Sequence, residues 1–283
     1  MNITKVKAIK WAKRIGYGVS ILLALFIPDS NELTLLKQSQ ATQVLDANND
    51  LIGKIYAYDR QSISYSDFPK HLIDALIATE DARFYDHNGI DNKSLLRVFF
   101  KSILMSDDSS GGGSTITLQL AKNLFGRKDY GAIGIVVNKI RESIVARRIE
   151  NLYSKKEILT LYLNTVPFPD NTYGIESASE KFFNAHTKDL SLVQSATLVG
   201  SLKANTSYNP RRYPKKSAAR KNVVIHQMEK YGYLTPAQAT KAKTDSIVVD
   251  YQNYAPNEGL APYFRAEIKR QLDSLLKQKK YLK

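Results

Sequence analysis

The chain has 283 residues, of which 43% are hydrophobic and 24% charged, as in a globular protein with a substantial core. Lys and Arg outnumber Asp and Glu by 41 to 27, and this net charge of +14 favours an anionic partner: nucleic acid, a membrane surface or a phosphorylated substrate. The absence of cysteine excludes disulfides, thiolate metal sites and a cysteine nucleophile.

The N-terminal segment predicts export across a membrane. Residues 1–14 form a basic head, residues 15–28 an apolar run that ends at a proline, and residues 29–42 a polar stalk. We interpret the apolar run as a single transmembrane anchor helix, although it is shorter than the ~20 residues that cross a bilayer. A cleaved signal peptide remains the alternative. Under either interpretation, the positive-inside rule keeps the head in the cytoplasm and places the remainder outside.

The rest of the chain predicts a mainly helical domain, residues 43–245, that begins with a small β-hairpin. Two strand-like runs flank the turn signal Asn48-Asn49-Asp50. A capping box at Ser154 and Glu157, and Thr235 followed by Pro236, each predict the start of a helix. Helical spacing of apolar residues predicts further helices over residues 71–79, 92–104, 114–125, 135–152, 191–202 and 215–231.

Two stretches complete the organisation. Residues 106–113 are rich in Ser, Asp and Gly and predict a loop. Residues 246–283 form a C-terminal extension, within which residues 263–283 predict a basic amphipathic helix.

Glu80 is the first candidate for catalysis. It lies with Asp81 at the end of an apolar helical run, close to Arg83 and His87. A carboxylate that emerges from an apolar helix is partly desolvated, which suits a general base near neutral pH. Taken alone, however, the local sequence favours a solvated helix end with Arg83 as an ion-pair partner.

A glycine-rich stretch precedes the helix predicted from Ser114. Free N–H groups at a helix N-terminus, with hydroxyls nearby, bind anions such as phosphate. The stretch lacks the Lys-Ser/Thr ending of a P-loop, so binding of a nucleoside triphosphate is not expected. A flexible loop followed by a helix cap is the alternative.

Cations follow in the next two helices. Lys139 and Glu142 are three residues apart and therefore share a helix face, with Lys122 and Arg141 close in sequence. Cations around a carboxylate suit a diphosphate leaving group, whose developing charge they neutralise. A salt-bridged surface helix is the commoner structure for such a pattern.

Other kinds of site find less support. Residues 203–221 hold seven basic residues and no acid, but an exported chain rarely meets nucleic acid, so phosphates of the membrane or substrate are the expected partners. The four histidines show no zinc-site spacing. Ser274 to Lys277 matches Ser-x-x-Lys, but only six residues follow, so transpeptidase activity is not expected.

In order and spacing, five stretches resemble the motifs of the peptidoglycan glycosyltransferases. These enzymes occur as monofunctional proteins and as the first domain of class A penicillin-binding proteins. The similarity covers roughly residues 43–240, and the five stretches are residues 78–91, 113–123, 139–150, 155–164 and 220–228. Residues 261–265 resemble the junction to the transpeptidase half of a bifunctional enzyme.

The resemblance implies a lysozyme-like fold and the polymerisation of lipid II into glycan strands, by inverting β-1,4 transfer with release of undecaprenyl diphosphate. It implies that Glu80 is the base that deprotonates the acceptor hydroxyl. Glu142 is the second catalytic residue, which assists the leaving group through a divalent cation such as Mg²⁺ or orients the basic residues. The substrate-binding residues that it implies are Asp81, Arg83, Phe84, Ser114, Thr115, Gln119, Lys122, Asn123, Lys139 and Arg141.

Several positions depart from the family's pattern. Leu118 and Asn138 stand where the second and third motifs usually have Gln and Arg, and Ala82 stands where a basic residue is common. Phe168-Pro169 stands where Phe-Gly is usual. An arginine that often contacts the diphosphate has two candidate positions here, Arg127 and Lys128. These departures concern substrate contacts rather than the two glutamates.

The implied partners are lipid II, the growing glycan strand, an anionic membrane and the cell-wall synthesis machinery. The implied location is the bacterial inner membrane, crossed once, with the catalytic domain on the outer side. The alternative function is that of a peptidoglycan-cleaving enzyme with a related lysozyme-like fold. A cleaving enzyme needs a proton donor for a poor leaving group but no basic cradle for a diphosphate, so Lys122, Lys139 and Arg141 argue against it.

Overall fold

The structure is a computed structural model, and it describes residues 42–45, 47–48, 51–55, 59–93, 113–252 and 262–281. The predicted head, anchor and stalk, most of the helix predicted over residues 92–104 and nearly all of the following loop lie outside the described residues. Within the described ranges, no helix combines the length and the apolar character needed to cross a membrane.

Helices dominate the domain, as predicted. They are α3 (Lys70–Glu80), α5 (Ile116–Phe125), α6 (Gly134–Leu152), α7 (Lys155–Thr165), α8 (Ile175–Phe183), α9 (Leu192–Ser201), α10 (Pro214–Lys230), α11 (Pro236–Thr244) and α12 (Pro262–Tyr281). Short 3₁₀ turns lie at Tyr65–Asp67, Phe84–Asp86, Gly131–Ile133 and Thr187–Asp189. The predicted starts of α7 and α11 are confirmed, since both helices begin with complete capping boxes.

The predicted hairpin is confirmed. It consists of β1 (Thr42–Leu45) and β2 (Leu51–Ile55), which pair antiparallel with Thr42 opposite Ile55. A second sheet does not follow from the sequence prediction. In it, β3 (Asp59–Arg60) pairs parallel with β5 (Thr172–Tyr173), which also pairs antiparallel with β4 (Pro167–Phe168). Strands of two residues are too short to show an alternating pattern, which explains their absence from the prediction.

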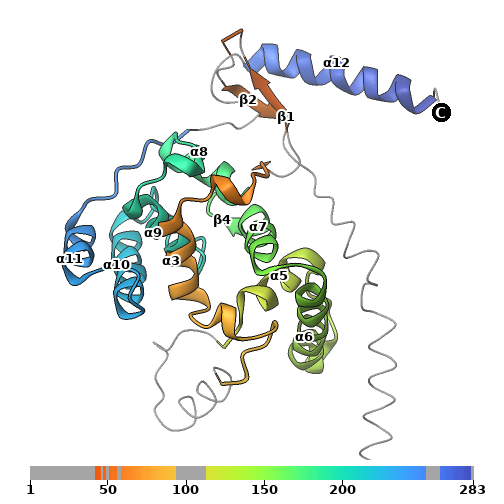
Figure 1. Cartoon of the computed structure of the whole chain (residues 1–283). Helices are drawn as coiled ribbons and strands as arrows, with labels where there is room; N and C mark the ends of the chain where they lie inside the picture. Colours follow the sequence, from red (N-terminus) through yellow and green to blue (C-terminus); the bar gives the residue numbers. More distant parts are fainter. Residues whose placement is uncertain are drawn as a thin grey trace, which may run out of the picture.

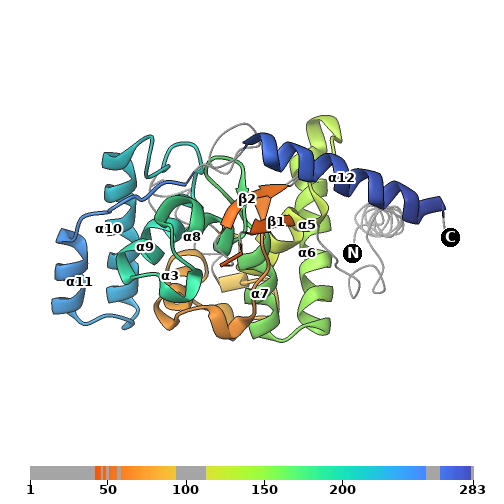
Figure 2. The ribbon, with the colours of Figure 1, turned by 90° about the horizontal axis from the view of Figure 1, so that it is seen from above.

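The helices form two groups that meet at α7 and α8 (Figure 1). In one group α3 packs on α9 and α10, and α10 packs on α11; in the other α5 packs on α6 and α7. Seen from above, α10 and α11 lie at one end of the domain and α5 and α6 at the other (Figure 2), while the hairpin and α12 lie above the helices in the view of Figure 1. The two groups place the candidate site residues, which come from α3, α5, α6 and α7.

A continuous apolar core joins the two groups. Leu72 and Leu76 of α3, Leu120 of α5, and Leu159 and Leu163 of α7 are all completely buried. Burial of such side chains contributes about 1.5–3 kcal/mol each. α8 carries apolar residues at helical spacing, Ile175, Ala178, Phe182 and Phe183, but the sequence prediction does not include it; all of its residues are buried, polar ones included.

Candidate active site

Glu80 is the last residue of α3, a helix with an apolar face packed into the core. Six of its eleven residues are buried, which fixes the axis of the helix and the place where it ends. The helix ends at Asp81, whose backbone leaves the helical conformation, with φ −157° and ψ 72°. The Glu80 carboxylate is half-buried, and its Oε2 accepts a hydrogen bond of 2.8 Å from Nε2 of Gln119.

Gln119 brings α5 and α7 to this carboxylate. It lies in the first half of α5, and its Oε1 accepts a hydrogen bond of 2.8 Å from the hydroxyl of Tyr162 in α7. The predicted neighbours Glu80 and Gln119 are therefore in direct contact, although 39 positions separate them. The hydroxyl of Tyr162 has no assigned role in the sequence prediction.

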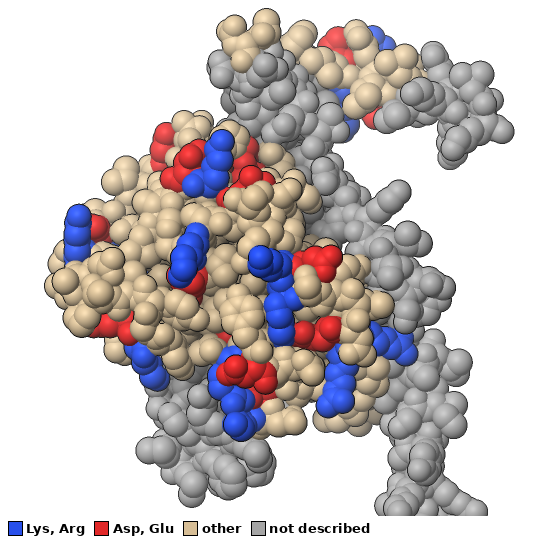
Figure 3. All heavy atoms as spheres, viewed as in Figure 1, with Lys and Arg blue, Asp and Glu red and all other residues tan. Residues whose placement is uncertain are grey.

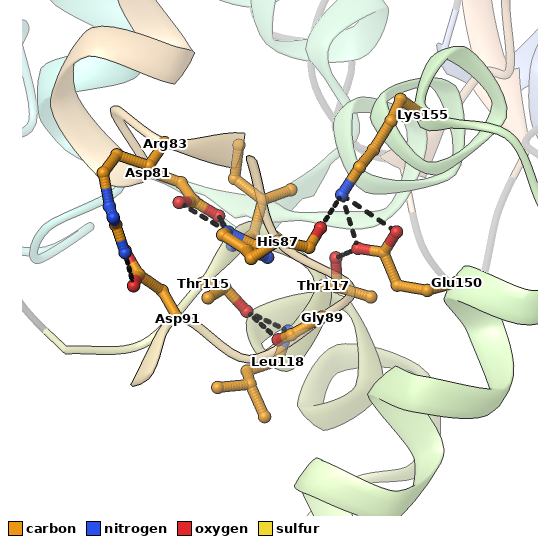
Figure 4. A network of polar contacts seen from close by, with 11 residues as sticks. Asp81, Arg83, His87, Gly89, Asp91, Thr115, Thr117, Leu118, Glu150 and Lys155 are labelled. Carbon is orange, nitrogen blue, oxygen red and sulfur yellow. Dashed lines mark hydrogen bonds and ion pairs between the residues drawn. The ribbon is translucent and has the colours of Figure 1, made fainter. Parts of the chain in front are cut away.

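Asp81 fastens α3 to α5. Its buried carboxylate accepts hydrogen bonds from the backbone N–H of Ile116 at 3.0 Å and from Nε2 of His87 at 2.9 Å. Thr115 caps the same helix end and donates its hydroxyl to the carbonyl of Gly89 at 2.6 Å. Figure 4 shows this network, in which the loop after α3 and the N-terminus of α5 are tied together. Asp81 and Thr115 thus hold the helix that carries Gln119.

These contacts change the expected use of the helix N-terminus. Among the first three N–H groups of α5, that of Ile116 is bonded to Asp81 and that of Leu118 to the Thr115 hydroxyl. An internal carboxylate occupies the place that the sequence suggests for a phosphate. A carboxylate from the chain itself satisfies the helix N-terminus without the cost of recruiting a ligand.

Arg83 and Phe84 lie in the segment that follows Glu80, and their side chains serve other contacts. Arg83 forms a two-pronged ion pair with the buried Asp91, and Phe84 is completely buried in the core. The Lys155 ammonium lies 4.3 Å from the centroid of the Phe84 ring and donates to the His87 carbonyl at 2.7 Å. These side chains hold the loop after α3 and make no contact with the Glu80 carboxylate that the structure records.

Lys155 also forms an ion pair with Glu150. Its ammonium lies 2.9 Å from Oε2 of Glu150 in α6, and Glu150 accepts a 2.6 Å hydrogen bond from the Thr117 hydroxyl. Because α5, α6 and α7 each contribute one of these residues, the group fixes the three helices around the candidate site (Figure 4).

Glu142 lies in a different setting from Glu80. Its side chain is buried on α6, with Oε1 at 2.9 Å from Nε of Arg127 and Oε2 at 2.8 Å from the Lys139 ammonium. Lys139 also donates to the hydroxyl of Ser114 at 3.1 Å. Burial alone would raise the pKa of Glu142, but the hydrogen bonds from Arg127 and Lys139 outweigh it and lower the pKa below its ordinary value. Glu142 therefore stays ionised between two cations.

Of the two candidates for the missing arginine, Arg127 is the one whose side chain reaches Glu142. The main chain of Lys128 is held by Asn138, which accepts from its N–H at 3.1 Å and donates to its carbonyl at 2.8 Å. Asn138 also accepts a 3.3 Å hydrogen bond from Arg141. The departure from the usual arginine at position 138 thus has a structural use, since this asparagine secures the loop that presents Arg127.

The remaining predicted residues are less closely tied to either glutamate. Lys122 is exposed and Asn123 half-buried on α5, one turn beyond Gln119 and on the same helix face. Arg141 is buried beside Asn138, so its guanidinium does not face the solvent from which a diphosphate would approach. The structure thus joins Gln119 to Glu80, and Ser114 and Lys139 to Glu142.

Charges of both signs alternate over the surface in the view of Figure 3. On this face, basic side chains lie next to acidic ones rather than in a block of one sign. In the basic stretch 203–221, Arg211 and Arg212 pair with Asp170, and Lys221 is buried against three backbone carbonyls. Part of the positive charge of this stretch is therefore used inside the fold.

A cluster of metal-binding side chains lies elsewhere. Glu176 and Glu180 of α8 and the following His186 bring three potential ligand atoms within 4.8 Å of one another, so this cluster could hold a metal ion. His186 already lies 2.7 Å from Glu176, and that hydrogen bond raises the pKa of the imidazole. None of the three residues belongs to the predicted site.

Comparison with known proteins identifies the architecture that carries this site. A family model described as Transglycosylase matches residues 48–229, a range that includes both glutamates and every predicted binding residue. The chain belongs to the transglycosylase family.

Relatives of this transglycosylase are found among penicillin-binding proteins. It is 36% identical over 244 residues to penicillin-binding protein 1F of Bacillus subtilis, covering 86% of this chain and 33% of the relative. It is 34% identical to penicillin-binding protein 1A of Aquifex aeolicus, covering 85% of this chain and 34% of the relative. The chain thus spans about a third of the length of these relatives.

A crystal structure of penicillin-binding protein 1A from Haemophilus influenzae also matches. The alignment covers 83% of this chain and 24% of that one, with a TM-score of 0.46 and 22% sequence identity.

Proposed function

We propose that this transglycosylase polymerises lipid II into glycan strands and that Glu80 is its base. The observation that carries the proposal is that α5 bridges two glutamates in unlike settings. Through Gln119 it donates a hydrogen bond to Glu80, and at its N-terminal end Ser114 accepts one from Lys139, the ion-pair partner of Glu142. A glycosyl transfer needs a proton acceptor at the attacking hydroxyl and positive charge at the departing diphosphate. The surroundings of the two glutamates match these two needs.

On the acceptor side, Glu80 takes the proton of the sugar 4-hydroxyl as the oxygen attacks the anomeric carbon of the donor. The bond from that carbon to the diphosphate breaks, and the configuration inverts because attack and departure occur on opposite faces. A general base must be held firmly and still be reached by the substrate. The half-buried end of the packed helix α3 meets both needs.

On the donor side, the diphosphate leaves with its negative charge. Arg127 and Lys139 are half-exposed at their charged ends, so they can turn from Glu142 to phosphate oxygens, with Lys122 exposed on the neighbouring helix. Diphosphate is already a good leaving group, so charge neutralisation replaces a strong acid. Glu142 keeps these cations in position when no substrate is bound.

A magnesium ion at Glu142 is a poor fit to the residues around it. Mg²⁺ prefers an octahedral set of oxygen ligands, and one carboxylate whose two oxygens face Arg127 and Lys139 offers little of that. The proposal therefore assigns charge neutralisation to the side chains, and no step depends on a metal held by Glu142.

The setting of the domain follows from the same proposal. We place the lysozyme-like domain outside the cytoplasmic membrane, held there by residues 15–28 as a single-pass anchor, with residues 43–245 as the catalytic unit. Lipid II, the growing strand and an anionic membrane are then its partners, and the net charge of +14 supports such partners.

The test is polymerisation by the full chain in detergent micelles supplied with lipid II, read as glycan products on a gel. Glu80→Gln should lower the rate about 100- to 10,000-fold, because it removes a general base while keeping the shape of the side chain. Glu267→Gln is the matched control, since Glu267 is an exposed glutamate of α12 paired with Arg270. Unchanged polymerisation by Glu80→Gln would refute its role, and cleavage of preformed glycan without synthesis would favour the hydrolase.

A further inference from the structure

A chain of two hydrogen bonds ends at the Glu80 carboxylate. It begins at the hydroxyl of Tyr162, passes through the side-chain amide of Gln119 and reaches Oε2 of Glu80, with both bonds at 2.8 Å. The three residues come from α7, α5 and α3, so the chain links three helices at the candidate base.

The Tyr162 side chain is completely buried, and Gln119 is the hydrogen-bond partner recorded for its hydroxyl. A buried phenol needs such a partner, because an unpaired hydroxyl in the core is costly. Burial, with the nearby charge of Glu80 as a smaller cause, raises the pKa of Tyr162 well above its ordinary value. The phenol therefore keeps its proton and acts as a donor to Gln119.

Gln119 is the element of the chain that has two states. A carboxamide has nearly the same shape after a 180° flip, but the flip exchanges an acceptor for a donor. With Nε2 toward Glu80, the amide donates to an ionised carboxylate. With Oε1 toward Glu80, two acceptors would face each other unless Glu80 carried a proton.

The hydroxyl of Tyr162 biases this choice. As a donor to Oε1 of Gln119, it favours the state in which Nε2 faces Glu80, and a hydrogen bond to the charged form of an acid favours that form. We propose that Tyr162 is a positioning residue that holds Gln119 in the orientation in which Nε2 donates to the Glu80 carboxylate. The inference rests on the proposed function of Glu80 as base, and it names a residue that touches neither substrate nor Glu80.

The test variant is Tyr162→Phe, which removes the hydroxyl and keeps the ring. Without the donor, both orientations of Gln119 become accessible, and Glu80 gains a proton more readily. The acid limb of the pH profile of kcat/KM for lipid II polymerisation should move to higher pH, and the rate below neutral pH should fall roughly tenfold. Tyr65→Phe is the control, because Tyr65 packs edge-on against Phe68 without joining this chain of hydrogen bonds.

A second measurement does not depend on activity. The side-chain ¹⁵N–¹H signals of Gln119, labelled in the full chain in micelles, should titrate with the neighbouring carboxyl. In Tyr162→Phe the midpoint of that titration should lie at higher pH than in the parent and in Tyr65→Phe. A midpoint and an acid limb that both stay in place would overturn the proposal, even if the variant were less stable or slower.

A double-mutant cycle tests whether Tyr162 acts on Glu80 through Gln119, which we call the relay, or by a separate route. In a Gln119→Ala background, the further change Tyr162→Phe should leave the acid limb where Gln119→Ala alone puts it. A full additional shift in that background would show that Tyr162 acts by another route and would refute the relay. Failure of the parent chain to polymerise lipid II would count against the proposed function, whereas the Gln119 titration would still decide the relay.

Discussion

Two glutamates of one domain are held in opposite ways. Glu80 lies at the end of an apolar helix and receives a hydrogen bond from a neutral amide, whereas Glu142 lies between the cations Arg127 and Lys139. A carboxylate beside a neutral donor can accept a proton in a reaction, while one between two cations is held as an ion. Under the proposed function, the surroundings, and not the residue type, divide the two tasks.

The supports of the two regions differ in the same sense. Around Glu80, tightly packed backbone and neutral hydrogen bonds fix the geometry, as in the link between Gln119 and Tyr162. Around Glu142, the side chains of the two cations are half-exposed and held by ion pairs. The region around Glu80 should therefore be sensitive to lost geometry, and the region around Glu142 to lost positive charge.

After Glu80→Gln, the largest effect is expected from the cationic region. Lys139→Met and Arg127→Met should each lower kcat/KM for lipid II polymerisation about 100-fold, because each removes a positive charge from the departing diphosphate. Lys188→Met, at an exposed lysine of a 3₁₀ turn, is the control. Steady-state rates at two salt concentrations are the measurement. Losses no greater than that of the control would break the comparison.

Next comes the backbone that supports α7. Gly174 has φ +80°, and a Cβ there would lie 2.8 Å from the carbonyl oxygen of Asn164, whose side chain clamps both backbone groups of Ile63. Gly174→Ala should therefore cost about 2–4 kcal/mol and lower Tm by roughly 5–10 °C. Gly232→Ala is the matched control, because Gly232 also has positive φ but open space around it, so that only the strain of about 1–2 kcal/mol applies. Equal losses in thermal unfolding would show that the close approach to Asn164 is unimportant.

A third prediction concerns a cation that serves the fold alone. The Lys221 ammonium is buried and donates to the carbonyls of Ala242, Lys243 and Asp245, which close the end of α11, and burial lowers its pKa. Lys221→Met should destabilise the domain by about 1–3 kcal/mol, because those carbonyls lose their donor. Exposed Lys215 provides the control Lys215→Met. If Lys221→Met instead impaired turnover at unchanged Tm, Lys221 would join the cationic region.

The smallest effect is a pH dependence of stability. The pKa of Glu142 is lowered in the folded state, so its ion pairs stabilise the fold above its ordinary pKa of 4.5, and that contribution disappears as pH falls through the lowered value. The Tm of the parent should therefore exceed that of Glu142→Gln at pH 7, and the difference should shrink toward pH 3. A difference that grows on acidification would contradict the assignment of Glu142 as an ion.

Much of this arrangement can be predicted from the sequence by itself. The apolar spacing of α3, the capping box of α7 and the Lys139–Glu142 pair are local patterns, and each reappears in the structure where the spacing predicts it. Local patterns suffice there because the residues concerned lie within one or two turns of each other. The five motifs likewise identify the family, since their order is a property of the chain.

Contacts between distant residues required the tertiary structure. The Tyr162–Gln119–Glu80 chain joins positions 43 and 39 residues apart, and Asp81 occupies a helix N-terminus that by sequence is open to phosphate. The burial of every residue of α8, its polar residues included, is likewise decided by the elements packed around it. The sequence by itself determined which groups are candidates for the chemistry, while packing decided which of them meet, because burial forces each polar group to find a partner among those that the fold brings near.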